Sequence, residues 1–218
     1  MNRNTLVVGA AALLLAAFAY GAHSYRSQKV AQVAAAPATL PPALVREGAV
    51  ELGPADAKVV IVEFFDPACD TCAEFAPIMK SFVQDNPGKV KLVERYAPLH
   101  PGSREMVAIL EAAKAQDRYW QVLDVMFANQ SIWANHENPQ PELIWDLLEK
   151  NGLDVAKLKT DMQDPAIAAA IAEDIADSKT MGVVQTPEFF VDGKALPTWG
   201  LQQLKDLVRS ELAAQYPR

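Results

Sequence analysis

The sequence predicts an α/β fold in which helices cover both faces of one mixed sheet. Two strand-like segments, VVIVEFF (59–65) and KVKLVERY (89–96), flank a stretch of helical periodicity. A helical block at about 103–181 separates them from a strand–turn–strand pattern and a last helix. A βαβ half with parallel strands and a C-terminal ββα half with an antiparallel hairpin can share one sheet, with the helical block inserted between them.

The first half begins with a strand that we expect to be buried on both faces. Segment 59–65 is almost continuously apolar and rich in β-branched residues, as strands of parallel sheets are. The helix that follows is expected to contain Pro77, which should kink it, and to end near Asn86-Pro87-Gly88. Its apolar residues repeat at helical spacing, at Phe75, Ile78, Met79, Phe82 and Val83.

The helical block contains recognisable helix starts and stops. Ser103 is expected to cap a first helix, and residues 119–130 form a second. Pro141 opens a third helix that Asn151-Gly152 closes. Asp164-Pro165 combines a capping side chain with a proline at the first helical position, and so opens a fourth.

The C-terminal half shows a hairpin and a helix. EFFV (188–191) reads as a strand, Asp192-Gly193 as a tight turn, and KALPT (194–198) as the returning strand. An apolar face at helical spacing follows, with Leu201, Leu204, Leu207, Val208 and Leu212.

Length and charge restrict the possible functions. The chain has 218 residues, 50% of them hydrophobic, which suits one domain with a real core and an appendage. Its net charge is −7 and no basic block appears, so the sequence argues against nucleic acid as a partner.

The N-terminus predicts export. Arg3 precedes an apolar run over 5–22, so residues 1–24 form either a cleaved signal, with Ala17-Phe18-Ala19 as the cleavage site, or a membrane anchor. The Ala- and Pro-rich residues 25–44 read as a semi-stiff tether, and 45–218 as the domain. The expected place is the bacterial cell envelope on the periplasmic side, with the domain anchored or released.

Cys69 and Cys72 are the only cysteines of the chain, and they follow the first strand as CDTC. A disulfide across two residues closes too small a loop to stabilise the fold, so the pair is expected to serve chemistry. Cys69 should lie at the helix start, where backbone N–H groups and the helix dipole favour a nucleophilic thiolate. Cys72, one turn further and more buried, would act as the resolving thiol.

Other uses of a thiol pair remain open from the residues alone. A zinc site needs about four ligands, and the chain adds only His23, His100 and His136. The pair could hold a soft ion such as Cu(I), form an inert disulfide, or belong to a catalytically silent module that binds clients. We expect no bound metal and no cofactor.

Glu63 lies six residues before Cys69 on the predicted central strand. Burial there would raise its pKa and would let it pass protons to or from Cys72. A strand carboxyl that reaches solvent at a sheet edge is the alternative. Asp66 and His100 receive no defined role.

The stretches VEFFDPACDTCAEFAP (62–77) and VVQTPEFFVDG (183–193) resemble those of the DsbA-like thiol:disulfide oxidoreductases of the thioredoxin superfamily. The resemblance covers about 45–215 and implies a thioredoxin-like mixed sheet with a helical insertion. It also implies that Pro187 is a cis proline beside the cysteines, and that the backbone of Thr186 pairs with an extended substrate segment. The family similarly carries an acid near the place of Glu63.

The resemblance implies an enzyme that exchanges the Cys69–Cys72 disulfide with exported proteins that contain cysteines, and a membrane redox partner that recycles it. Oxidase, isomerase and reductase directions all fit the sequence. Asp70-Thr71 departs from the dipeptides common in the family. Because the charge of Asp70 opposes a neighbouring thiolate, we expect a milder oxidant than the strongest members.

Overall fold

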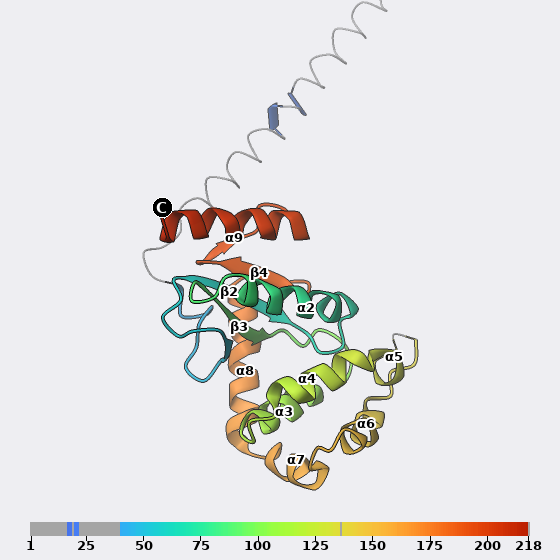
Figure 1. Ribbon diagram of the computed structural model, residues 1–218. Coiled ribbons are helices and arrows are strands. Elements are labelled where there is room, and N and C mark those ends of the chain that lie inside the picture. Colours follow the sequence, from blue (N-terminus) through green and yellow to red (C-terminus); the bar gives the residue numbers. More distant parts are fainter. Residues whose placement is uncertain (1–16, 19, 22–39, 136, 218) are drawn as a thin grey trace, which may run out of the picture.

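The computed structural model describes residues 17, 18, 20, 21, 40–135 and 137–217, and in this part of the chain five strands form one sheet (Figure 1). The strand order is β1-β3-β2-β4-β5, and the predicted mixed α/β fold is confirmed. The strands are β1 (Val50–Leu52), β2 (Val59–Phe65), β3 (Val90–Tyr96), β4 (Glu188–Val191) and β5 (Lys194–Ala195).

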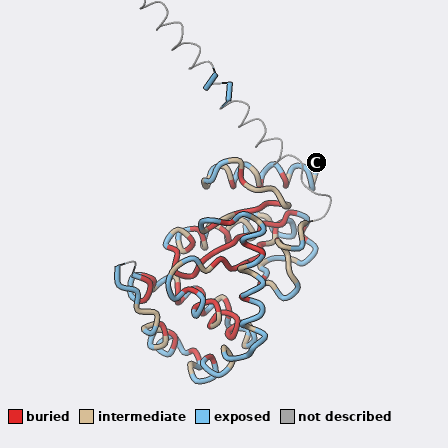
Figure 2. The backbone as a smooth tube through the Cα atoms, turned by 180° about the vertical axis from the view of Figure 1, so that it is seen from behind, coloured by how far each residue is buried: buried red, intermediate tan, exposed pale blue. Residues whose placement is uncertain are grey.

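Strand β2 is the centre of the sheet. It runs parallel to β3, with Val59 opposite Val90, and antiparallel to β4, with Ile61 opposite Val191. All seven of its residues are buried, as the nearly unbroken apolar run predicts. Figure 2 shows buried backbone through the middle of the molecule, where the strands lie. Strand β1 pairs antiparallel with β3 at the edge and was not predicted.

Helices cover the two faces of the sheet, and Figure 1 shows how they are arranged. Helices α2 (Asp70–Asp85) and α9 (Leu201–Gln215) pack with alternate residues of β2 and β3 on one face. Helix α8 (Pro165–Thr180) contacts β3 on the opposite side. Side chains such as Val60 and Phe64 form a separate core there.

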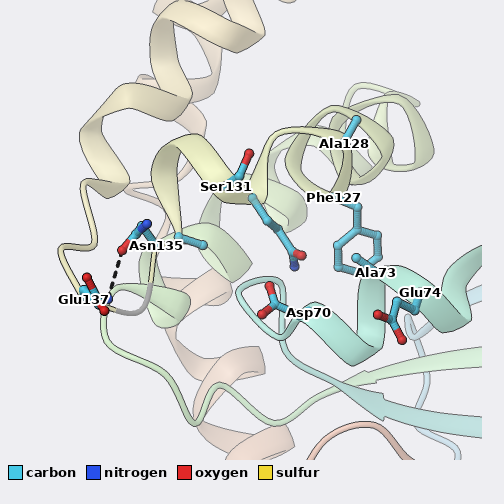
Figure 3. Close-up of a pocket in the computed structure, with 10 residues that line it drawn as sticks. Asp70, Ala73, Glu74, Phe127, Ala128, Ser131, Asn135 and Glu137 are labelled. Atoms are coloured by element: carbon cyan, nitrogen blue, oxygen red, sulfur yellow. Dashed lines mark hydrogen bonds between the residues drawn. The ribbon is translucent and has the colours of Figure 1, made fainter.

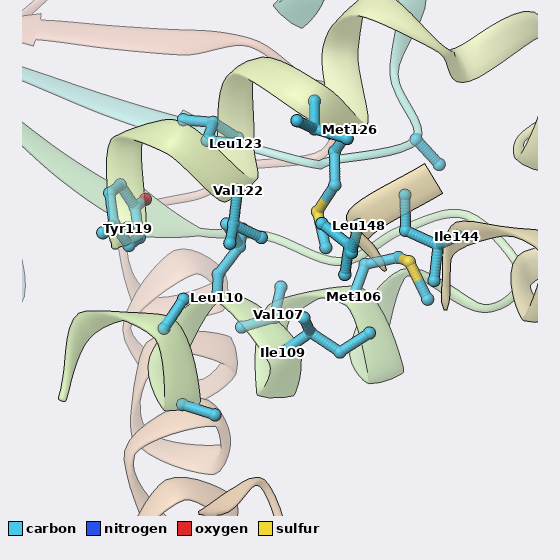
Figure 4. Packing of buried hydrophobic residues seen from close by; sticks show 14 of the residues in the cluster. Met106, Val107, Ile109, Leu110, Tyr119, Val122, Leu123, Met126, Ile144 and Leu148 are labelled. Atoms are coloured by element: carbon cyan, nitrogen blue, oxygen red, sulfur yellow. The ribbon is translucent and has the colours of Figure 1, made fainter. Parts of the chain in front are cut away.

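The remaining helices lie between β3 and α8 in the sequence and build their own core (Figure 4). Met106, Leu110, Val122 and Met126 are among its fully buried members. Cys69 and Cys72 belong to the same cluster, so the cysteines lie where the sheet meets the helical block. The helices are α3 (Ser103–Lys114), α4 (Tyr119–Ala128), α5 (Gln130–Trp133), a 3₁₀ turn (Pro141–Leu143), α6 (Ile144–Lys150) and α7 (Val155–Asp161).

Two local predictions need correction. Ser103 does not cap α3: Gly102, with φ of 81°, precedes the helix, and the Ser103 hydroxyl donates to Asp66 instead. Of the predicted returning strand KALPT, only Lys194–Ala195 pairs with β4. Pro77 lies inside helix α2, which has 16 residues, as the sequence predicted.

The folded body begins before residue 45. Leu44 is fully buried under the sheet, and the Arg95 guanidinium donates to the Ala43 carbonyl oxygen at 2.8 Å. Residues 40–44 therefore belong to the packed domain rather than to the expected tether. Almost all of the expected leader, 1–24, and most of the tether, 25–44, lie outside the described residues. No helix within the described residues is long and apolar enough to cross a bilayer.

Candidate active site

The two cysteines lie at the start of α2, directly after the buried central strand. Cys69 is the N-cap residue, with extended backbone angles of −82° and 119°, and its N–H donates to the Asp66 carbonyl oxygen at 3.0 Å. Cys72 lies in the first turn of the helix. Both are free thiols, and Cys69 is 6% exposed whereas Cys72 is completely buried. Only Cys69 can therefore be reached from solvent.

The surroundings push the pKa values of the two thiols in opposite directions. A hydrogen bond from Cys72 lowers the pKa of Cys69 to about 6, against the effect of burial, with help from Thr186 and from the backbone of Cys72 and Thr71. Burial raises the pKa of Cys72, and the bond to Cys69 and the charge of Glu63 raise it further. At neutral pH Cys69, the more accessible of the two, is thus mainly a thiolate, and Cys72 is a thiol.

The loop before β4, which contains Thr186 and Pro187, lies against the cysteines. The Thr186–Pro187 peptide bond is cis, as the resemblance implied. When Cys69 is protonated, its thiol donates to the carbonyl oxygen of Thr186, with 3.2 Å between Sγ and O. The Trp199 indole N–H donates to the Pro187 carbonyl oxygen at 2.9 Å, and its ring packs on Phe75 of α2. These contacts hold the proline loop against the cysteines.

Glu63 is buried in the middle of the sheet, next to a second acid that sequence reasoning missed. Glu63 and Glu94 are partners in the parallel β2–β3 ladder and are 3% and 6% exposed. Burial raises the pKa of Glu63 well above its usual range, and the charges of Glu94 and Cys69 add to this. Burial also raises the pKa of Glu94, to about 8. No sequence signal pointed to Glu94, because only the register of the parallel pair places it next to Glu63.

Asp66, which the sequence left without a role, is the fully buried centre of the turn before Cys69. One carboxylate oxygen accepts from the Ala68 N–H at 2.8 Å and from the Ser103 hydroxyl. The other accepts from the backbone N–H groups of Leu99 and His100, at 2.6 and 2.9 Å, and lies 2.8 Å from the His100 ring nitrogen Nδ1. Asp66 therefore ties the cysteine turn to the loop before α3.

Gln130 joins the same turn to the helical block. Its buried side-chain amide donates to the carbonyl oxygens of Pro67 and Cys69, at 2.8 and 3.0 Å. Since Gln130 begins α5, the block is hydrogen-bonded to the backbone on both sides of Ala68 and next to the reactive sulfur. No sequence pattern indicated this contact.

A cavity opens beside the cysteine turn, between the first turns of α2 and the helices α4 and α5 (Figure 3). Its volume is about 580 Å³, and Asp70, Glu74 and Glu137 give it an acidic lining. Figure 3 shows Asp70 and Glu74 on the α2 side and Asn135 and Glu137 across from them. Within the described residues, no group of three or more His, Cys, Asp or Glu side chains is placed to hold a metal ion.

Comparison with known proteins agrees with this geometry. Residues 46–209 match the family model described as Thioredoxin. The chain belongs to the thioredoxin family. Among solved structures, this family member is similar to oxidised BdbD from Bacillus subtilis, at 26% identity and a TM-score of 0.65, over 76% of this chain and 94% of BdbD. The resemblance to DsbA-like proteins that the sequence showed is confirmed.

Curated relatives fall into two groups. The Na⁺/H⁺ antiporter NhaA of Herminiimonas arsenicoxydans is 31% identical over 144 residues, which are 66% of this thioredoxin-family chain and 22% of the antiporter. The chain thus spans about a fifth of the length of the antiporters that it matches. A Rickettsia conorii protein, provisionally named a protein-disulfide oxidoreductase, is 24% identical over 75% of this chain and 60% of its own length.

Proposed function

We propose that the protein is an exported thiol:disulfide oxidoreductase that exchanges its Cys69–Cys72 disulfide with cysteines of protein substrates. The observation that carries the proposal is the pairing of an accessible sulfur of low pKa with a buried sulfur of high pKa, beside a cis proline. The names of the Rickettsia relative and the likeness to BdbD support it.

Oxidation of a substrate would proceed in two displacements. A substrate thiolate attacks Cys69 Sγ of the disulfide, the Cys69–Cys72 bond breaks, and Cys72 leaves and takes a proton from Glu63. A second substrate thiolate then attacks the substrate sulfur of the mixed disulfide and expels Cys69 as a thiolate. The substrate loses two electrons and the protein gains them. In the reverse direction Cys69 attacks a substrate disulfide, and Cys72 resolves the mixed disulfide.

The low pKa of Cys69 favours the oxidising direction. A stabilised thiolate is a good leaving group and lowers the free energy of the reduced protein, so the disulfide form becomes the stronger oxidant. We therefore propose that the protein donates disulfides, and that a membrane redox partner returns it to the disulfide form.

Substrates would bind as an extended segment along the proline loop. The Thr186 carbonyl oxygen lies next to Cys69, so a chain that pairs with this backbone would bring its cysteine to the attacking sulfur. Recognition through main-chain hydrogen bonds tolerates many sequences, which suits an enzyme with several clients.

The test is oxidation of a reduced dithiol peptide by the disulfide form, with Cys69→Ala and Cys72→Ser as variants. We expect Cys69→Ala, which cannot form the disulfide, to lose activity. Cys72→Ser, incubated instead with the oxidised disulfide form of the peptide, should accumulate a mixed disulfide at Cys69, because the thiolate of Cys69 attacks and no second thiol resolves the product. Activity of Cys69→Ala equal to the wild type would leave only a client-binding module. Tight 1:1 Cu(I) binding by the reduced pair, without dithiol oxidation, would favour the metal-binding alternative.

A further inference from the structure

We propose that Glu94 is the second group of a proton relay, which connects Cys72 through Glu63 to a cavity on the β1 side of the sheet. The proposal rests on the proposed redox function and adds a route for the proton that each exchange must move. Cys72 is completely buried, so its proton cannot pass directly to bulk water.

The two acids lie in one row across the sheet. The register places Val50, Glu94, Glu63 and Phe189 side by side on β1, β3, β2 and β4. Partners in a ladder share a face, and neighbouring strands are about 4.8 Å apart. Of the two acids in this row, Glu63 is the one whose charge acts on Cys72. Glu94 therefore lies one strand further from the cysteines than Glu63.

Glu94 has an oxygen that is free to bind a proton carrier. Its Oε2 atom is buried and has no hydrogen-bond partner among the described residues. Glu94 also lines a cavity of about 90 Å³, together with Val50, Tyr96, Glu111 and Lys114. A polar cavity of this size holds several water molecules, which the carboxyl and hydroxyl groups of its wall can bind.

Polar side chains continue from the cavity to the surface. The Tyr96 hydroxyl donates to Glu111 Oε1 at 2.8 Å, and Glu111 forms an ion pair with Lys114. The Lys114 side chain is 35% exposed and donates to the Gly48 carbonyl oxygen. A proton that leaves Glu94 would thus enter a cavity whose wall also carries hydrogen-bonded polar groups that extend to the surface.

The charged groups around Glu94 come from each element packed on it. Lys80 of α2 favours its ionised form, and Glu63 of β2 opposes it. Tyr119 of α4 interacts with Glu94, Tyr96 and Glu111, and burial raises its pKa well above the usual range, so it stays neutral. Burial raises the pKa of Glu94 to about 8, close to the pH at which a relay must both take and give a proton.

The relay balances in both directions. When Cys72 attacks a mixed disulfide at Cys69, its proton passes to Glu63, whose own proton passes to Glu94 and then to the cavity. When the Cys69–Cys72 bond is broken by a substrate thiolate, the proton travels back and neutralises the leaving Cys72 thiolate. The carboxyl groups are unchanged after each turnover.

The experiment measures how fast Cys72 resolves a mixed disulfide. Reduced protein is mixed with oxidised glutathione, quenched with acid at set times and analysed by mass. For Glu94→Gln we expect the limiting resolution rate to fall about tenfold, because an amide cannot pass the proton on. The inflection of the pH profile should move to lower pH, because the like charge that raises the pKa of Glu63 is lost.

The controls separate a relay from a structural effect. The control variant is Asp192→Asn. Like Glu94, Asp192 has a buried carboxylate oxygen without a hydrogen-bond partner, and Asn tolerates its φ of 49°. This variant should leave the pH profile of the resolution rate unchanged. Glu63→Gln combined with Glu94→Gln should resolve no more slowly than Glu63→Gln alone. Additive losses, an unshifted inflection or an unchanged rate in Glu94→Gln would each overturn the relay.

A measurement on the wild type keeps the proposal testable if the variants fold poorly. The protein is labelled with ¹³C at the glutamate carboxyls. We expect the resonances of Glu63 and Glu94 to titrate together, at a pH well above the usual range for glutamate, and to shift when the disulfide is reduced. A Glu94 resonance that ignores the redox state would contradict the relay. Alkylation of Cys69 by iodoacetamide separates this proposal from the proposed function. If only the relay is wrong, Cys69 still reacts with iodoacetamide; if the redox function itself is wrong, Cys69 does not react.

Discussion

Cys69 and Cys72 carry the same side chain, and the fold gives them opposite acid–base behaviour. At Cys69 the pKa falls because the neighbouring thiol, Thr186 and the first backbone N–H groups of α2 hydrogen-bond to the thiolate. At Cys72 burial raises the pKa, and the hydrogen bond to Cys69 and the charge of Glu63 raise it further. One turn of helix therefore separates a leaving group from a thiol that must be deprotonated before it reacts.

The low pKa of Cys69 makes the stability of the reduced protein depend on pH. The pKa is about 6 in the folded protein and near 8.5 in the unfolded chain. Between these values the unfolded chain binds more protons, so stability rises with pH, and the gain is lost as pH falls through 6. Burial of Glu63 and Glu94 raises the pKa of both carboxyls and opposes this gain in the same pH range, so the contribution of Cys69 is measured as a difference. In urea unfolding from pH 5.5 to 8.5, the stability of the reduced wild type relative to Cys69→Ser should rise with pH. Parallel curves for the two proteins would contradict the assigned pKa.

Asp66 shows how a buried carboxylate can hold an active-site turn. Asp66→Asn replaces one of its acceptor oxygens by a donor, which leaves N–H or O–H donors without a partner. We expect the free energy of unfolding to fall by about 2 kcal/mol. Chemical denaturation should show this loss, whereas the exposed Asp70→Asn should stay within about 0.5 kcal/mol of the wild type. Equal stabilities of the two variants would show that the contacts of Asp66 add nothing.

At the scale of helices and strands, the spacing of apolar residues and the local capping and turn residues predicted most elements correctly. The apolar run of β2, the stripe of α2, the Asp164-Pro165 start of α8 and the Asp192-Gly193 turn all appear as expected. The Asp164 carboxylate accepts from the Ala166 N–H at 2.8 Å, which is the predicted cap. These features depend on residues close together in the sequence.

Other elements depend on contacts that are distant in the sequence. Strand β1 has three residues, too few to show an alternation, and exists because β3 offers it a partner. Gln130 reaches Cys69 across 61 residues, and Glu94 meets Glu63 only through the strand register. Ser103 was predicted to cap a helix because serine hydroxyls often do so, but its hydroxyl donates a hydrogen bond to the carboxylate of Asp66.

Helix α5 is expected to influence the chemistry through Gln130 alone. Gln130→Leu removes two hydrogen bonds to the cysteine turn and leaves two buried carbonyl oxygens without this donor. We expect the free energy of unfolding to fall by about 1–3 kcal/mol and the rate of dithiol oxidation to fall with it. The exposed neighbour Ser131→Ala is the control. If Gln130→Leu matches Ser131→Ala in both measurements, the helical block does not hold the turn.

For the whole molecule, the thioredoxin-like sheet and the helical block form one body, and the cysteines lie at their junction. The block supplies Gln130, while the sheet supplies Glu63 and Glu94. The proline loop comes from the C-terminal half. The site therefore needs all three parts of the sequence, which explains why a short motif predicted the cysteines and not their surroundings.

At the scale of the whole chain, we propose that residues 1–24 direct its export. A fusion of residues 1–45 to a reporter enzyme that is active only outside the cytoplasm should be active in bacteria. Leu14→Arg places a charge in the apolar run and should abolish the activity. Alkaline washing of the membranes then distinguishes an anchored chain from a released one. An active reporter in the Leu14→Arg fusion would argue against an export signal.

The central claim is that Cys69 is ionised at neutral pH where α2 begins, next to a thiol that is not. The most direct test is the pH dependence of alkylation of the reduced protein by iodoacetamide, with the modified cysteine identified by mass. We expect modification at Cys69 alone, with a midpoint near pH 6. A midpoint near 8.5, the value of free cysteine, or preferential modification of Cys72, would contradict the claim.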